Sequence, residues 1–428
     1  AGAAEALRST DGQRRTDADL QRDTLLLMLY CPQFTPAEVF AAHERYGELM
    51  DGKLRVPPPV VRGKGSAGNA DRPLRVGYIS QDFRNRSAGH FIEGIVEHHD
   101  RARVEPWCYS HRLVEDGLTE RVRTAAAGFR EIQRMSDQQV AQQMRADGID
   151  IAVDLTGHTG INRVGVMAYR PAPVGATYMG YAATTGLKAV DYRLVDAHTD
   201  PAPEADALAT EQLVRLDPCF LCYTPPPHAP EVSGCPAESG GAVTFASFNT
   251  FAKITDDALA LWARITNEVG GSRLLVKNAG LNDPWLAGRF RERFERLGGD
   301  PDRLETMGET PTAAEHMGLY ARVDVALDTF PYNGTTTTLE AMWMGVPLVT
   351  VGGEAHVSRV GVSLLKNAGL DDLVGADADG YVRAAVGLAG DAGRRAALRG
   401  SLRETVRERL CDFGSFVPGL ESAYREMW

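Results

Sequence analysis

Short apolar runs alternate with longer amphipathic stretches along most of the chain. The apolar runs have the length of buried strands, and the stretches between them repeat their apolar residues at helical spacing. Because strands and helices take turns in this way, the first half predicts a parallel, doubly wound sheet. Its expected strands are Leu74–Ser80, Glu105–Ser110, Ile149–Asp154, Val174–Met179 and Asp191–Val195, and its expected helices are Gly89–His99, Thr119–Phe129 and Asp137–Ala146.

The second half repeats this alternation after a proline-rich connection, Tyr223–Pro236. Two successive α/β halves predict two Rossmann-like lobes that face a cleft, because ligands of such sheets lie beyond the carboxyl ends of the strands. The expected strands are Val243–Phe248, Ser272–Val276, Val323–Leu327 and Leu348–Val351, and the expected helices are Asp256–Glu268, Pro284–Arg296, Ala313–Ala321, Arg359–Ala368, Gly380–Arg409 and Phe416–Trp428.

Three parts follow from these patterns. Residues 1–70 form a helical linker segment, with two helical patterns separated at Cys31-Pro32 and a proline- and glycine-rich stretch after them. Residues 71–236 form the N-terminal Rossmann-like lobe, and residues 237–428 form the C-terminal Rossmann-like lobe with a terminal helix. The chain begins at Ala1 without Met, so we expect a processed product or a piece of something longer.

Composition and charge exclude some classes of function. The 428 residues carry a net charge of −11, which argues against nonspecific binding to the phosphate backbone of nucleic acid. No stretch reaches the roughly 18 apolar residues of a membrane span, and nothing resembles a signal peptide, so no membrane partner is expected. Six scattered cysteines indicate a reducing compartment, and we expect a cytoplasmic protein. Cys219 and Cys222 have the spacing of a zinc or redox pair, but without a second pair or a histidine cluster they are interpreted as buried structural thiols.

The turn that follows the strand at Val323–Leu327 has the character of a phosphate site. Asp328–Gly334 turns the chain, and Thr335–Thr338 open a helix that Gly345-Val-Pro347 ends. Threonine is poor inside a helix but suited to its start. Backbone N–H groups and the positive end of the helix dipole attract an anion at such a start, and the hydroxyls add donors. The alternative is a structural helix cap without a ligand.

Four other places carry side chains with useful chemistry near predicted strands. His90 opens a helix and suits a base or a donor to an anion, or is simply a polar helix-start residue. Asp154 and His158 enclose a turn that is either a ligand loop or structural. Lys253 follows a strand among apolar neighbours and suits a diphosphate, although most lysines are solvated surface residues. His316 lies at the opening of the helix before the central strand.

Longer motifs resemble one family. VTFASFNTFAKIT, ALDTFPYNGTTTTLEAMWMGVPLVTV, HVSRVGVSLLKNAGL and GLESAYREMW are similar to the catalytic region of the O-GlcNAc transferase and SPINDLY family, and so are VGYISQDFRNRSAGHFIE, DLTGHTGINRVGVMAYRPAPV and VRLDPCFLCYTP. The resemblance covers residues 74–428. It implies an inverting protein O-glycosyltransferase of the GT-B fold that uses a nucleotide sugar, no cofactor and no metal. The family's superhelix of TPR repeats has no counterpart here, and residues 1–55 resemble only the segment that joins it to the catalytic lobes.

The resemblance also implies roles for individual residues. Lys253 and the threonine helix start would bind the diphosphate, and Glu340 would hold the ribose. His90 would act as a base or contact the sugar and diphosphate, and Asp154 and His158 lie in the acceptor-side loop. The implied catalytic residues are therefore His90, Lys253, His158 and Asp154. The implied nucleotide-sugar contacts are Thr250, Lys253, His316, Asn333, Gly334, Thr335, Thr336, Thr337 and Glu340.

The motifs disagree about the identity of the sugar donor. His90 matches a histidine of the GlcNAc enzymes and favours UDP-GlcNAc. Thr335, Ala313 and Glu340 depart from those enzymes and are closer to the SPINDLY branch, some members of which use GDP-fucose, so a protein O-fucosyltransferase is the alternative. A sugar-nucleotide epimerase and a non-catalytic binding module are more distant alternatives. The expected partners are a nucleotide sugar and a protein or peptide with Ser or Thr hydroxyls.

Overall fold

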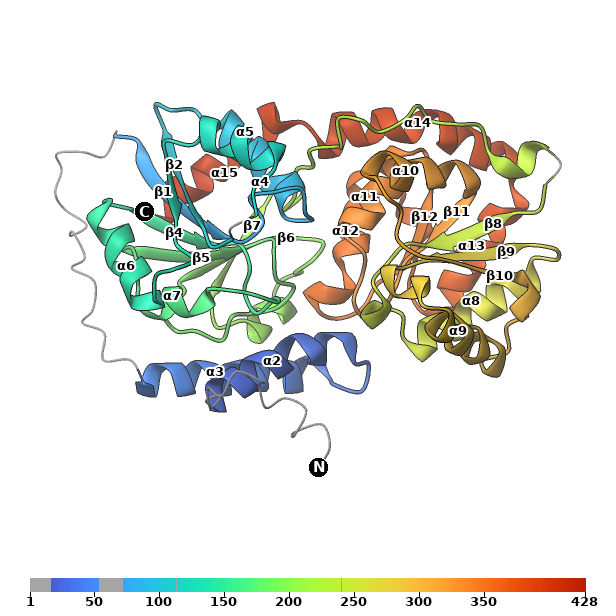
Figure 1. The fold of residues 1–428 in the computed structure, drawn as a ribbon, viewed down its shortest axis with the longest axis horizontal. Coiled ribbons are helices and arrows are strands. Elements are labelled where there is room, and N and C mark those ends of the chain that lie inside the picture. The colour runs from blue at the N-terminus through green and yellow to red at the C-terminus, as the bar shows by residue number, and fades with distance from the viewer. Residues whose placement is uncertain (1–16, 54–71, 113, 240) are drawn as a thin grey trace. The chain divides into compact units, whose positions relative to one another are not determined.

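The computed structural model describes residues 17–53, 72–112, 114–239 and 241–428. The chain divides into two compact units, each built on one parallel sheet (Figure 1). The first unit comprises Ala1–Phe220 together with Phe413–Trp428, and the second comprises Leu221–Asp412.

The first unit has seven parallel strands in the order β3-β2-β1-β4-β5-β6-β7. Strand β1 is buried except at Arg75, and its neighbouring residues serve opposite faces of the sheet. Ile79 joins an apolar core with residues of the helices α6 (Asp137–Ala146) and α7 (Val164–Ala168), whereas the Tyr78 hydroxyl lies 3.2 Å from the Tyr424 hydroxyl of α15 (Phe413–Met427). The strands are β1 (Leu74–Ser80), β2 (Val104–Ser110), β3 (Gly128–Glu131), β4 (Ile151–Asp154), β5 (Val174–Tyr178), β6 (Tyr192–Asp196) and β7 (Gln212–Leu216); the helices are α4 (Gly89–His98), α5 (Gly117–Ala125), α6 (Asp137–Ala146), α7 (Val164–Ala168) and α15 (Phe413–Met427).

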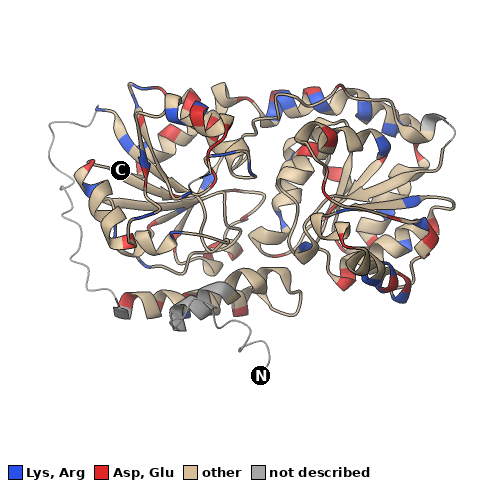
Figure 2. Ribbon diagram, viewed as in Figure 1, with Lys and Arg blue, Asp and Glu red and all other residues tan. Residues whose placement is uncertain are grey.

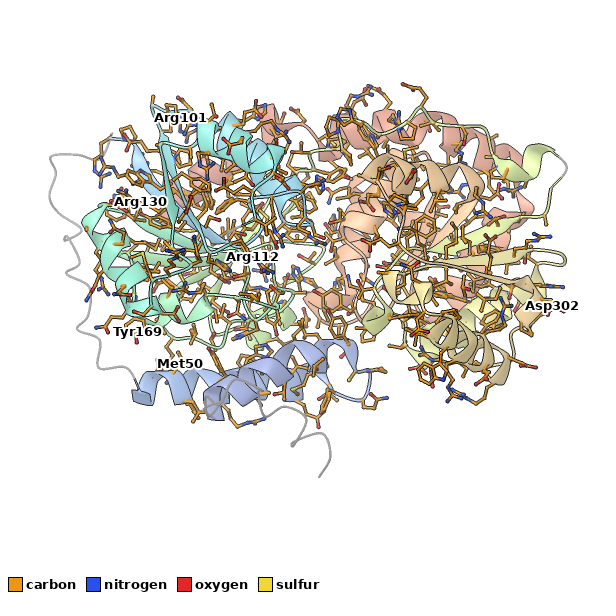
Figure 3. The ribbon with its side chains drawn as sticks, viewed as in Figure 1. Met50, Arg101, Arg112, Arg130, Tyr169 and Asp302 are labelled. Atoms are coloured by element: carbon orange, nitrogen blue, oxygen red, sulfur yellow. The ribbon has the colours of Figure 1, made fainter. Side chains whose placement is uncertain are left out.

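Two helices precede this sheet, α2 (Asp17–Tyr30) and α3 (Pro36–Lys53), as the helical patterns predicted. They lie side by side, and α3 packs on α7 (Figure 1). Helix α3 also lies close to the loop between β5 and β6 because it presents a glycine there: a Cβ added to Gly47 would lie 1.8 Å from the carbonyl oxygen of Gly186. Met50 of α3 and Tyr169 beyond α7 complete the same apolar core (Figure 3).

The terminal helix α15 belongs to the first unit, whereas the sequence grouped it with the second lobe. It packs on α4 and β7. The Phe413 ring stacks on His98 at 5.1 Å, and Glu421 accepts a hydrogen bond from the His99 ring at 3.0 Å. Gly94 makes room for Phe413, since a Cβ there would lie 2.2 Å from the ring. These contacts join residues more than 300 positions apart, which no local pattern predicts.

The second unit has six parallel strands in the order β10-β9-β8-β11-β12-β13. The single helical stretch expected over Gly380–Arg409 is two helices, because Asp391 ends one and its side chain caps the next by accepting from the Arg394 N–H at 2.9 Å. The strands are β8 (Thr244–Ser247), β9 (Arg273–Lys277), β10 (Leu304–Met307), β11 (Val325–Leu327), β12 (Leu348–Val351) and β13 (Val374–Gly375); the helices are α8 (Asp256–Glu268), α9 (Pro284–Arg296), α10 (Ala313–Gly318), α11 (Thr336–Trp343), α12 (Val360–Asn367), α13 (Ala378–Gly390) and α14 (Ala392–Leu410).

Four strands were not predicted, and they are the four edges of the two sheets: β3, β7, β10 and β13. An edge strand is covered on fewer sides, so its residues need not be continuously apolar. Strand β3 reads Gly-Phe-Arg-Glu with its last two residues exposed, and β13 has only two residues. The central strands, which are buried, were the ones that the hydrophobic pattern revealed.

Charged residues gather on the helices and are sparse on the strands (Figure 2). Acidic and basic side chains are interspersed on most helices. Within the described parts of the chain, none of the helices has the length and apolar character needed to cross a membrane. Cys219 and Cys222 are both buried, at 2% exposure each, as interpreted from the sequence.

Candidate functional site

Each sheet has one point at which the strand order reverses. In the second sheet β8 lies between β9 and β11, and in the first sheet β1 lies between β2 and β4. Connections that leave two neighbouring strands on opposite faces open a crevice there, and α/β proteins bind ligands in it. Lys253 follows β8 and the threonine helix start follows β11, so the second unit brings both phosphate-binding candidates to its reversal point. In the first sheet, His90 lies in α4, the helix that follows β1, and Asp154 is the last residue of β4, so both lie at or beyond the ends of the strands of the equivalent point.

The turn before the threonines is folded around Asp328, which is 1% exposed. One carboxylate oxygen accepts the backbone N–H of Thr329 at 2.8 Å and of Gly334 at 2.7 Å, and the other accepts the Thr350 hydroxyl at 2.7 Å. Burial nevertheless raises the pKa of Asp328 to about 6, and these hydrogen bonds and the charge of Lys253 work against that rise. Through these hydrogen bonds, the carboxylate of Asp328 fixes the conformation of the turn.

The start of α11 has several hydrogen-bond donors that lack a partner within the helix. No side chain caps it at Thr335, so the first backbone N–H groups of the helix have no partner within it. The hydroxyls of Thr336 and Thr338 are buried and, among the described residues, make no hydrogen bond. The Thr337 hydroxyl donates to the Asn249 side chain at 3.0 Å. A Cβ on Gly334 would lie 2.7 Å from the Thr337 hydroxyl oxygen, so a larger residue here would displace the threonine hydroxyls. A buried hydrogen-bond donor without a protein partner costs folding free energy. An anion that accepts hydrogen bonds from such donors removes this cost and is bound favourably.

Lys253 supplies the positive charge. Its ammonium donates to the carbonyl oxygen of Asn333 at 2.8 Å and lies 4.2 Å from the centre of the Tyr332 ring. Burial lowers the pKa of Lys253 to about 8, and the neighbouring Asp328 opposes that shift. Asn333 itself is fully buried, and its side chain donates to the Thr329 carbonyl and accepts from the Gly361 N–H. Asn333 thus shapes the loop and offers its backbone oxygen to the cation.

A second group lies beside the helix start. The His316 ring is 3.1 Å from a carboxylate oxygen of Glu340 through Nε2 and 2.9 Å from the ammonium of Lys277 through Nδ1. The rings of Phe248 and Tyr320 flank His316 at centroid distances of 5.8 and 5.9 Å. Side-chain exposures of 20% for His316 and 13% for Glu340 leave both accessible to a ligand. Burial lowers the pKa of Lys277.

Sequence reasoning missed some members of the site. Asn249 was part of a quoted motif but had no role, although its side chain positions Thr337. Lys277 was not singled out either, and only the pairing of β9 with β10 shows that it lies near α10 and His316. Thr250, which was implied as a nucleotide contact, is exposed at the start of the Phe251–Lys253 turn, where its carbonyl accepts the Lys253 N–H.

The candidates in the first unit differ in their surroundings. His90 is half-buried in the first turn of α4. Asp154 is fully buried and accepts from the Thr156 hydroxyl at 2.9 Å and the Gly157 N–H at 2.6 Å. Burial raises the pKa of Asp154, and these hydrogen bonds oppose the rise. The carboxylate of Asp154 therefore holds the turn after β4, as Asp328 does after β11.

His158 is enclosed by aromatic rings and is 3% exposed. Its Nε2–H donates to the Thr185 carbonyl at 2.8 Å, and the rings of His43, Tyr46 and Tyr181 lie 4.8–5.4 Å from its centroid. His43 and Tyr46 come from α3, so the N-terminal helices complete this cluster. Burial lowers the pKa of His43 to about 4. No local pattern indicated that helix α3 would cover His158.

The second unit therefore combines an uncapped helix start, buried hydroxyls and a cation, with an imidazole and a carboxylate beside them. Such a set can hold a diphosphate and the hydroxyls of an attached sugar ring. Among the described residues, no group of three or more His, Cys, Asp or Glu side chains is arranged to hold a metal ion.

Comparison with known proteins assigns the chain to a family. The model of glycosyl transferase family 41 matches residues 45–222 and 235–414. The chain belongs to this family. It is 42% identical over 416 residues to the tomato (Solanum lycopersicum) protein named probable UDP-N-acetylglucosamine–peptide N-acetylglucosaminyltransferase SPINDLY, covering 95% of this chain and 44% of that protein. It is 31% identical to the Arabidopsis thaliana protein named SEC, with the same probable activity in its name, covering 91% of this chain and 41% of that protein. The chain thus spans less than half the length of these relatives.

A solved structure of an O-GlcNAc transferase shows the same architecture. A mutant of the Thermobaculum terrenum enzyme superposes with a TM-score of 0.91 at 36% identity, over 97% of this chain and 78% of that one. The GT-B fold inferred from the motifs is therefore confirmed. A sucrose-phosphate synthase from Thermosynechococcus elongatus, with a TM-score of 0.53 and 13% identity, over 83% of this chain and 99% of that one, shares the fold alone.

Proposed function

We propose that this chain is the catalytic part of a protein O-glycosyltransferase that moves a sugar from a nucleoside diphosphate to a Ser or Thr hydroxyl. The observation that carries the proposal is the start of α11. It has no side-chain cap, and the buried hydroxyls of Thr336 and Thr338 have no protein partner among the described residues, while Lys253 lies at the same turn. This is a site prepared for a diphosphate rather than a closed structural cap.

The reaction follows from where charge develops. The acceptor oxygen attacks the anomeric carbon, the bond from that carbon to the diphosphate breaks, and the nucleoside diphosphate leaves with the electron pair. Lys253, the first N–H groups of α11 and the threonine hydroxyls stabilise the negative charge on the departing oxygen. Attack opposite to the leaving group inverts the anomeric centre. Because the leaving group is stabilised by fixed donors, we propose that no metal is required.

The acceptor hydroxyl must also lose its proton to a base. Among the three candidates of the first unit we propose His90, which is half-buried. Asp154 is occupied by the N–H and hydroxyl groups of its own turn, and His158 is enclosed by rings. We assign these two residues the role of shaping the acceptor-side loop.

For the donor we propose UDP-GlcNAc, which His90 favours and which the names of the SPINDLY and SEC relatives mention. GDP-fucose is the second candidate, because Thr335, Ala313 and Glu340 match the SPINDLY branch more closely on the nucleotide side. The same two lobes and diphosphate site would also serve a sugar-nucleotide epimerase, which would act without an acceptor.

Incubation of the protein with UDP-GlcNAc or GDP-fucose and Ser/Thr-rich acceptor peptides, followed by intact-mass spectrometry, tests the proposal. A transferase adds one N-acetylhexosamine or one deoxyhexose to the peptide and releases one nucleoside diphosphate for each. Conversion of the nucleotide sugar without a peptide would indicate an epimerase. Binding of a sugar-modified peptide without turnover of either donor would indicate a non-catalytic module.

A further inference from the structure

Lys277 is the last residue of β9, and it contacts a residue that is far away in the sequence. Its ammonium lies 2.9 Å from Nδ1 of His316 on α10, and Nε2 of the same ring lies 3.1 Å from Oε2 of Glu340 on α11. Three side chains from three elements thus form one chain of hydrogen bonds beside the proposed diphosphate site. The strand order β10-β9-β8-β11 makes this possible, because Lys277 pairs with Met307 at the end of β10, from which the chain continues to α10, while α11 follows β11 in the same sheet.

The direction of these hydrogen bonds follows from the donors. An ammonium group has only donors, so Nδ1 of His316 must accept. A neutral imidazole that accepts at Nδ1 carries its proton at Nε2, and that N–H donates to Glu340. Lys277 therefore selects one of the two tautomers of His316. The flanking rings of Phe248 and Tyr320 hold the imidazole in this orientation.

The tautomer of His316 determines how Glu340 is held. Its Oε2 is tied to His316, and among the described residues no hydrogen bond reaches its Oε1. A carboxylate held in this way presents one oxygen as an acceptor at the side of the site, with 13% of the side chain exposed. The vicinal hydroxyls of a ribose are donors of the matching kind.

We propose that Lys277 is a positioning residue for nucleotide binding, which fixes the Nε2–H tautomer of His316 and thereby aims Glu340 at the ribose hydroxyls of the nucleoside diphosphate. The inference rests on the proposed function. It adds Lys277, which acts through His316 and Glu340 and does not itself contact the ribose.

Calorimetric titration of Lys277→Met with UDP and GDP tests this, with 2′,3′-dideoxy nucleoside diphosphates as the second arm. We expect the substitution to weaken binding of the better ribonucleotide about tenfold, which is the scale of one hydrogen bond to a charged group. The dideoxy analogue should bind wild type and variant equally, because it lacks the donors that Glu340 accepts. Lys277→Arg, which also only donates, should restore most of the affinity, and exposed Lys366→Met is the matched control.

A spectroscopic arm is independent of any nucleotide. In protein labelled with ¹⁵N at its ten histidines, His316 is assigned from a His316→Gln variant. We expect its Nδ1 and Nε2 shifts to report the Nε2–H tautomer in wild type and to change in Lys277→Met. An unchanged tautomer would overturn the inference, as would equal losses for the ribo- and dideoxynucleotides or no loss at all. If neither nucleoside diphosphate binds wild type, the proposed function itself fails, and the NMR arm still decides on the tautomer.

Discussion

Replacement of Lys253 by alanine tests the main claim about the site. The substitution removes the ammonium at the turn, which donates to the Asn333 carbonyl and lies over the Tyr332 ring. Losing one preorganised donor to a developing oxyanion lowers the turnover number by about 10²- to 10³-fold, or roughly 3–4 kcal/mol of transition-state stabilisation. We therefore expect turnover to fall at least about 100-fold.

The fold should survive this change. Lys253→Ala loses one hydrogen bond from a charged donor, worth roughly 1.5–3 kcal/mol, and one cation–π contact of about 1 kcal/mol. It also removes an ammonium whose charged form is disfavoured by burial, which is why the pKa of Lys253 is lowered. Asp328 keeps its hydrogen bonds from Thr329, Gly334 and Thr350. These terms largely offset, so the melting temperature should move by only a few degrees.

The assay is single-turnover transfer from the nucleotide sugar to a peptide, with thermal unfolding measured on the same samples. Lys366→Ala, an exposed lysine on α12, is the matched control and should retain both activity and stability. Full activity of Lys253→Ala would remove this residue from the mechanism. A large loss of stability in step with the loss of activity would show that Lys253 is structural.

Activity should persist in excess EDTA; complete loss that Mn²⁺ or Mg²⁺ restores would show that the fixed donors at α11 are not sufficient. The kcat/KM for the nucleotide sugar should decline as pH rises through about 8, because burial lowers the pKa of Lys253 in the free enzyme to that value and the cation is then lost; a pH profile of kcat/KM that shows no decline above that pH would contradict this. Gly47→Ala should destabilise the docking of α3 by about 1–3 kcal/mol because its Cβ meets the Gly186 carbonyl, whereas Gly288→Ala on α9, which has open space, should be neutral or stabilising; equal melting temperatures for the two variants would refute the packing argument. UDP should bind at least about tenfold more tightly than GDP in a direct titration, since a base edge left unpaired in a site costs roughly 1–3 kcal/mol, and Glu340→Ala should weaken the better nucleotide through the ribose. Tighter binding of GDP would change the donor to GDP-fucose and leave the fold and the type of reaction unchanged.

The sequence by itself determined the buried central strands and the strongly amphipathic helices. Strands β1 and β12 and helices α6, α8 and α9 have the predicted bounds, because continuous burial and helical spacing are local properties of the chain. The phosphate site was also predictable in outline, since a strand, a glycine turn and a run of threonines are adjacent in sequence. Lys253 was found because it too follows a buried strand.

Only the tertiary structure decided what depends on pairing between distant residues. Edge strands are partly solvated and leave a weak pattern, so β3, β7, β10 and β13 appeared only when the sheets were assembled. The order of the strands placed the end of β9 beside the end of β10 and so brought Lys277 to His316, and through His316 to Glu340, which lie 39 and 63 positions further along the chain. The packing of α3 enclosed His158, and that of α15 joined the last residues to the first unit. Local sequence sets which side chains stand at strand ends, but the strand order, which is set by long-range burial and hydrogen bonding, sets which of those ends meet.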